Sequence, residues 1–147
     1  MFLGQFYHNL DDKNRLTMPA RFRDLLAEDG GAFLMRGFDQ NLIMLTTTTF
    51  NIVSDHINGL SFTDPKAREL RRLLFSSAGQ VEFDKLGRFV LPQYLREDAQ
   101  INNEAVIIGA GKYVEIWSPR AWTAQWNQLN DTASLSDRFK ELNIPFL

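Results

Sequence analysis

Residues 11–23 read DDKNRLTMPARFR, and residues 84–96 read DKLGRFVLPQYLR. At a constant offset of 73 positions, the Asp, Arg, Pro and final Arg of the first stretch all recur in the second. Apolar positions recur as well, since Leu16 is matched by Phe89. The similarity continues downstream over about 40 residues per copy. The chain is therefore a tandem duplication, and this repeat decides the expected fold.

Each copy shows the same order of predicted secondary structure. Apolar alternation predicts strands before and after the repeated turns, at residues 5–10, 15–18, 80–83 and 88–91. A second strand pair follows in each copy, at 32–35 and 42–46, and at 105–108 and 114–118. Short helices are expected to end at Leu26 and Ala99, with Pro19 and Pro92 as their first residues, and longer helices over 50–60, 65–74, 119–129 and 135–142. Because four short strands bury little apolar surface alone, the two copies should pack together.

The repeated turn has a defined chemistry. Asp11 and Asp84 open it, and Asn14 and Gly87 precede its Arg. Asn and Gly are the residues that best tolerate a left-handed backbone, as a type I turn with a bulge requires. One interpretation is structural, with the Asp accepting turn N–H groups and pairing with the Arg. The other is that a rigid basic hairpin presents Lys and Arg to an anionic partner.

The charge distribution favours the second interpretation. The chain has a net charge of −2 and a pI near 5.7, yet residues 11–23 and 84–96 each carry a local charge of +2. Two equivalent basic segments on an acidic chain suit a repeating polyanion, of which DNA is the obvious candidate. We expect DNA contacts from Lys13, Arg15, Arg21, Arg23, Lys85, Arg88 and Arg96, and turn-shaping roles for Asp11, Asn14, Asp84 and Gly87. Leu86 stands where the first copy has Lys13, so the second turn is expected to contact DNA less or to serve a subunit interface.

Other functional classes find little support in the sequence. The chain has no Cys and only two His, which excludes thiol catalysis and zinc ribbons. His56 beside Asp55 does not make a triad, because neighbouring helix positions face different directions. The basic run from Lys66 to Arg72 is expected to be a solvated helix face, with a DNA-backbone or subunit contact as the alternatives. We therefore expect no enzyme activity, no cofactor, no metal and no small-molecule substrate.

At these residues the sequence resembles the MraZ family, bacterial transcriptional regulators whose gene heads the division and cell wall cluster. The resemblance rests on MFLG at residues 1–4, the segment 10–19 with Arg23, and the second copy at 84–92, and it covers essentially the whole chain. It implies an α+β fold, in which two tandem ββαββ repeats form a pseudo-two-fold double-split β-α-β barrel of the AbrB/SpoVT swapped-hairpin kind with flanking helices. The implied units are residues 1–76 and 77–147, packed as one compact body.

The resemblance also implies a function. MraZ-like proteins form ring-like oligomers and bind short direct repeats upstream of their own operon, chiefly as repressors. The implied partners of this chain are promoter double-stranded DNA and further copies of itself in a cyclic homo-oligomer, with no membrane. The N-terminus has no basic flank before an apolar run, and we expect a cytoplasmic, nucleoid-associated protein. An antitoxin-like or structural protein-binding module on the same fold remains the alternative.

Overall fold

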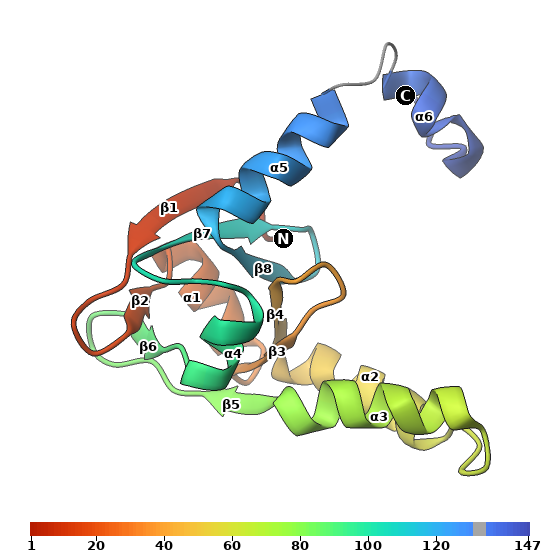
Figure 1. Cartoon of the computed structure of the whole chain (residues 1–147), viewed down its shortest axis with the longest axis horizontal. Helices are drawn as coiled ribbons and strands as arrows, with labels where there is room; N and C mark the ends of the chain where they lie inside the picture. The colour runs from red at the N-terminus through yellow and green to blue at the C-terminus, as the bar shows by residue number, and fades with distance from the viewer. Residues whose placement is uncertain (131–134) are drawn as a thin grey trace.

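A computed structural model describes residues 1–130 and 135–147 of the chain (Figure 1). The first half contains β1 (Gln5–Asn9), β2 (Arg15–Thr17), α1 (Ala20–Glu28), β3 (Ala32–Arg36), β4 (Leu42–Thr46), α2 (Thr47–Asn58) and α3 (Pro65–Ser77). The second half contains β5 (Gly79–Val81), β6 (Arg88–Val90), α4 (Gln93–Asp98), β7 (Glu104–Gly109), β8 (Val114–Trp117) and α5 (Pro119–Asn130), followed by α6 (Leu135–Arg138) and the 3-10 turn η1 (Lys140–Leu142). The predicted order of elements is confirmed in both copies.

The two copies exchange strands. A six-stranded sheet has the order β1-β7-β8-β4-β3-β5, and a separate two-stranded ribbon pairs β2 with β6. All these pairs are antiparallel. Each copy therefore completes the sheet of the other, since β1 pairs with β7 and β5 pairs with β3. The pairing is unchanged when each strand is replaced by its repeat equivalent, so the topology has an internal pseudo-two-fold symmetry.

Each repeated turn is closed by one backbone hydrogen bond across its ends, from Asp11 N–H to the Arg15 carbonyl (3.0 Å) and from Asp84 N–H to the Arg88 carbonyl (2.9 Å). The flanking strands do not otherwise pair with each other, so no regular hairpin extends from the turn as the sequence suggested. The partner strands come from the opposite copy, because Arg15–Thr17 lies antiparallel to Arg88–Val90. Two backbone hydrogen bonds lengthen this ribbon, from Met18 to the Gly87 carbonyl (2.9 Å) and from Leu91 to the Asn14 carbonyl (3.0 Å). The two turns, 73 residues apart in sequence, consequently lie side by side at one edge of the molecule (Figure 1).

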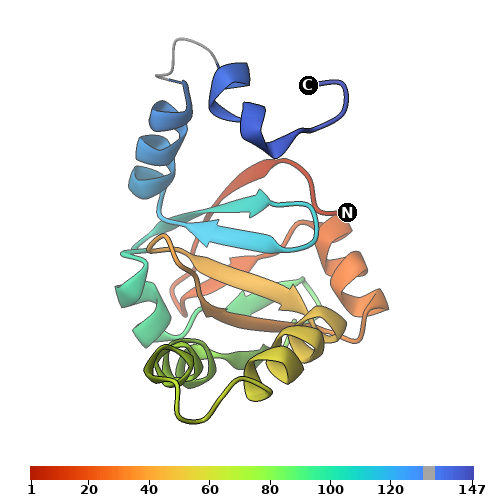
Figure 2. The same cartoon turned by 90° about the vertical axis from the view of Figure 1, so that its right-hand side faces the viewer.

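The core lies between the ribbon, the sheet and the two short helices. Leu16 and Phe89 point inward from the ribbon and are 0% and 1% exposed. Phe22 of α1 and Leu95 of α4 belong to the same cluster, and these two helices lie on opposite sides of the molecule (Figure 2). Full burial of such side chains contributes about 1.5–3 kcal/mol each to folding. The packing that holds the two copies together is therefore the same packing that places the ribbon.

The longer helices cover the two ends of the sheet (Figure 2). Apolar residues of α2 and α3, including Ile57 and Leu74, pack against Met35 and Leu45 of the sheet. On α5, Trp122 packs on Trp117, while Trp126 is 46% exposed. The predicted last helix is confirmed as the shorter α6 and η1.

The starts of the two short helices differ from expectation. Pro19 and Pro92 are the N-caps of α1 and α4 and not their first residues, because their ψ angles of 136° and 145° are extended. At the start of α3, Asp64 is the N-cap, and its carboxylate accepts the N–H of Lys66 at 2.9 Å.

Candidate nucleic-acid interface

The outer face of the β2–β6 ribbon is the candidate site. Side chains alternate along a strand, so the inward positions of Leu16 and Phe89 leave four outward positions. These outward residues are Arg15, Thr17, Arg88 and Val90. A two-stranded antiparallel ribbon is one of the two elements that the major groove of B-DNA admits. We name this surface, together with turn residues 11–14 and 84–87, the ribbon face.

The two motif arginines are held in place by the aspartates that open the turns. In the first turn, Asp11 Oδ1 accepts the backbone N–H groups of Lys13 and Arg15, both at 2.9 Å, and Oδ2 accepts Arg15 Nε at 2.7 Å. The second turn repeats this geometry, since Asp84 Oδ1 accepts from Leu86 and Arg88 at 2.9 Å and Oδ2 accepts Arg88 Nε at 2.7 Å. Each aspartate therefore ties the backbone of its turn to the arginine that follows it.

The two turns also contact each other. Arg88 Nη1 lies 3.8 Å from Asp11 Oδ2, which joins the second motif to the first. Hydrogen bonds from the backbone and side chain of Arg15 lower the pKa of Asp11, and those from Arg88 lower the pKa of Asp84. Both aspartates are thus carboxylates at neutral pH, and they balance much of the charge of the two motif arginines.

The turns have the left-handed residues that the sequence predicted. Asn14 has φ 58° and Gly87 has φ 79°. The two positions are not equivalent in space, because a Cβ at Gly87 would overlap the guanidinium of Arg23. The repeat equivalent of Arg23, Arg96, instead donates from Nε to the Leu91 carbonyl at 3.0 Å. Glycine at 87 therefore lets Arg23 of the first copy lie against the turn of the second.

The other cations predicted to contact DNA are not paired with carboxylates of the described residues. Lys13 and Lys85 are exposed in the two turns, and Arg21 is exposed near the start of α1. Within the described part of the chain, the ion pairs are confined to Arg15 and Arg88 with Asp11 and Asp84. Arg23 and Arg96 accordingly form no ion pair with a carboxylate within the described residues.

Two residues of the ribbon face were missed by the sequence analysis. Thr17 and Val90 occupy equivalent repeat positions and alternate with the buried Leu16 and Phe89. Val90 is 58% exposed although it is apolar. The alternation was visible in the sequence, but the outward direction became evident only from the pairing of β2 with β6.

The basic run on α3 has a structural role in part. Arg68 donates from Nη1 to the Phe62 carbonyl at 3.2 Å, and Arg71 donates from Nη2 to the Leu60 carbonyl. These bonds hold the loop between α2 and α3, whereas Lys66 and Arg72 are exposed. Lys66 and Arg72 thus lie on a solvated helix face as expected, while Arg68 and Arg71 also bind carbonyls of the preceding loop.

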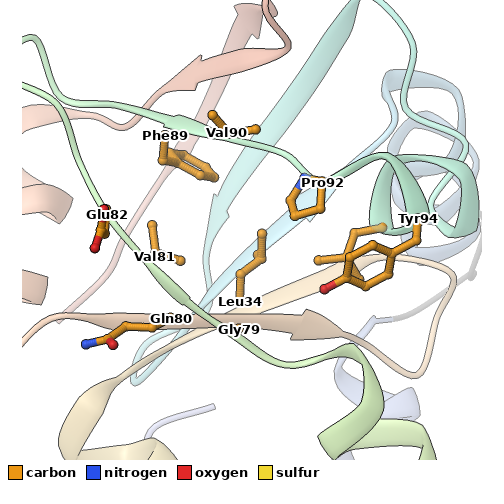
Figure 3. A pocket seen from close by; sticks show the side chains of 10 residues that line it. Leu34, Gly79, Gln80, Val81, Glu82, Phe89, Val90, Pro92 and Tyr94 are labelled. Carbon is orange, nitrogen blue, oxygen red and sulfur yellow. The ribbon is translucent and has the colours of Figure 1, made fainter.

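A hollow of about 370 Å³ lies beside the edge strand β5 (Figure 3). Apolar side chains such as Leu34, Phe89 and Tyr94 line it. The repeat equivalent of Gly79 is Phe6, whose ring packs edge-to-face on Phe22 at 5.3 Å. The hollow thus lies beside Gly79, at the position where the first copy has the aromatic ring of Phe6.

Metal and membrane sites find no support in the described residues. Across residues 1–130 and 135–147, no three His, Asp or Glu side chains form a group able to hold a metal ion. No helix within those ranges combines the length and apolar character needed to cross a bilayer. Gly109 lies close against the backbone of residues 2–3.

Comparison with known proteins identifies similar chains over nearly the full length. A family model described as "MraZ protein, putative antitoxin-like" matches residues 1–73 and again residues 74–143. A relative from Herpetosiphon aurantiacus named "Transcriptional regulator MraZ" is 45% identical over 90% of this chain and 92% of its own. Relatives of the same name from Thermomicrobium roseum and Dictyoglomus thermophilum are 46% and 42% identical, over 85% and 97% of this chain and 87% and 94% of theirs.

Proposed function

Because the chain belongs to the MraZ family, we propose that it is a sequence-specific, double-stranded DNA-binding transcriptional regulator that represses its own division and cell wall gene cluster. The observation that carries this proposal is the ribbon face. It brings both motif arginines, both turn lysines and the Arg23 guanidinium onto one antiparallel ribbon of a chain whose net charge is −2. The names of the relatives support the same class of function.

The proposed DNA contacts divide into two kinds. Lys13, Lys85, Arg21, Arg23 and Arg96 carry charge that no carboxylate of the described chain balances, so they are assigned to phosphates. Arg15 and Arg88 are fixed through Nε, which orients their terminal nitrogens as forks suited to guanine O6 and N7. The Asp–Arg pairs therefore act as orienting supports for base recognition.

The proposed fold completes this picture. The exchanged strands fit a swapped-hairpin barrel of the AbrB/SpoVT kind, with residues 1–76 and 77–147 as its two units. Its pseudo-two-fold axis passes through the β2–β6 ribbon, so the two copies contribute to one interface and not to two separate hairpins.

The regulator is proposed to bind tandem direct repeats as a cyclic homo-oligomer. One short ribbon offers few phosphate contacts, and several protomers on successive repeats raise the affinity by avidity. Much of the apolar surface of Phe50–Leu60 and Leu70–Phe75 packs within the protomer, so these segments have little apolar surface left for a subunit contact. Trp126, which is 46% exposed, remains available for it.

Quantitative DNA binding tests the proposal. Affinity is measured at one salt concentration for DNA from upstream of the chain's own gene and for a scrambled sequence. The wild type should prefer the upstream DNA, and the Lys13→Ala/Lys85→Ala double variant should bind both more weakly. Lys66→Ala/Arg72→Ala removes the same charge from α3 and should bind as the wild type does. Equal affinity of the wild type for both DNAs contradicts the proposal and leaves an antitoxin-like, protein-binding module as the better reading of the fold.

Binding to altered repeats tests the assembly separately. Light scattering of the DNA-free protein should give a mass of several protomers. Inserting a half-turn of about 5 bp between repeats should weaken binding, because successive protomers then face different sides of the duplex. A monomer in solution, or indifference to the insertion, contradicts the cyclic assembly.

A further inference from the structure

The ribbon face is not symmetric in its chemistry although its backbone is. At two pairs of equivalent positions, the first copy has a polar side chain and the second an apolar one. Lys13 corresponds to Leu86, and Thr17 corresponds to Val90. Leu86 and Val90 are 66% and 58% exposed, so neither is placed there by the packing of the core.

The backbone of Leu86 is hydrogen-bonded within the turn, and the residue is exposed to solvent. Its backbone N–H donates to Asp84 Oδ1 at 2.9 Å, and the neighbouring Gly87 N–H donates to the Asp84 carbonyl at 3.0 Å. Arg88 closes the turn, with its own N–H on the same carboxylate oxygen. The side chain therefore projects from a turn whose backbone is already ordered, and presenting it to a partner requires little further loss of backbone entropy.

An aliphatic side chain cannot contact a phosphate favourably, but the major groove offers one apolar feature. That feature is the C5-methyl group of thymine, which apolar side chains contact in direct readout. We propose that Leu86 is a specificity-determining residue that packs on a thymine methyl in the major groove. This inference rests on the proposed DNA-binding function and assigns the second turn a base contact where Lys13 of the first turn contacts phosphate.

The asymmetry has a consequence for the binding site. A fully symmetric pseudo-dimer would read a palindrome, since equivalent contacts fall on two-fold-related bases. With Leu86 on one side and Lys13 on the other, the two halves of the ribbon face recognise different features. Each protomer then has a defined direction on the duplex, as binding to direct repeats requires.

Deoxyuridine substitution measures the contact directly, because uracil lacks only the methyl group. In one repeat of the upstream DNA, each thymine is replaced by deoxyuridine in turn and the affinity of the wild type is measured. One position should weaken binding about 4-fold, the factor expected for one buried methyl group. Leu86→Ala should bind the unmodified DNA more weakly and be insensitive to the substitution, whereas Leu86→Met should remain sensitive.

Lys13→Ala is the matched control in the equivalent turn. It should lose affinity for every DNA and still respond to the deoxyuridine. The Leu86 contact is overturned if Leu86→Ala still binds the deoxyuridine-substituted DNA more weakly than the unmodified DNA. It is also overturned if the wild type prefers the upstream DNA but does not respond to any deoxyuridine substitution. Both results leave the proposed function intact. A change of oligomeric mass in Leu86→Ala also overturns it, because Leu86 then belongs to a subunit contact. Failure of the wild type to prefer the upstream DNA removes the proposed function itself.

Discussion

Replacement of Gly87 by alanine tests the construction of the turn on which the second motif depends. Gly87 has φ 79°, where a residue with a Cβ costs about 1–2 kcal/mol relative to glycine. The new Cβ would also overlap the guanidinium of Arg23, but this is the end of a flexible side chain that can move away at small cost. We therefore expect the free energy of unfolding to fall by about 1–2 kcal/mol.

Thermal unfolding followed by circular dichroism measures this effect. For a chain of this size, 1 kcal/mol corresponds to about 4 °C in Tm, so Gly87→Ala should melt about 4–8 °C lower. Gly87→Asn is the matched control, because the chain itself places Asn14 in the left-handed region at φ 58°. It should melt closer to the wild type than Gly87→Ala does. An unchanged Tm for Gly87→Ala, or an equal loss for the two variants, would refute the left-handed turn.

Three further predictions follow from other contacts. Gly109→Ala should lower the free energy of unfolding by about 2–4 kcal/mol in denaturant unfolding, because the new Cβ would overlap the backbone of residues 2–3 and displace the buried Phe2. A loss below about 0.5 kcal/mol argues against this packing. The pKa of Asp84 in the folded protein lies below the ordinary value of 3.8. The ionised carboxylate of Asp84 therefore stabilises the fold fully above pH 3.8, and this stabilisation is lost as the pH falls through the lowered pKa. Acid unfolding of Asp84→Asn should accordingly lack this part of the pH dependence, and identical acid profiles would contradict the role of the pair. Lys13→Ala should make the slope of log affinity against log salt less steep by about 1, whereas an unchanged slope shows that Lys13 contacts no phosphate.

The duplication predicted the elements of the fold but not their partners. The equivalence of residues 11–23 and 84–96 gave the order of strands and helices in both copies, because periodicity and turn chemistry are local properties. Strand exchange is non-local, and the apolar pattern of residues 5–9 is satisfied equally by pairing with β2 or with β7. The sequence therefore suggested a closed hairpin where the structure pairs β1 with β7.

The candidate site was predictable in composition and less so in geometry. The Asp–Arg spacing left a structural pair and a basic hairpin that faces an anionic partner as open alternatives. The 2.7 Å contacts show that the pair forms in both copies, and the proposed base contacts of the two arginines add to this pair and do not replace it. The position of Arg23 against Gly87 required three-dimensional information, since the two residues belong to different copies. Spacing within one copy carries no signal for such a contact.

Site-specific crosslinking tests the central claim, that the outer face of the β2–β6 ribbon contacts DNA. The chain has no cysteine, so a single Val90→Cys variant can carry a photoactivatable crosslinker at a position that is 58% exposed on the ribbon. Ile52→Cys on α2 is the matched control at 66% exposure. The account predicts that upstream DNA crosslinks to position 90 and not to position 52, and that unlabelled upstream DNA competes better than scrambled DNA. Crosslinking at position 52 without crosslinking at position 90 would contradict it.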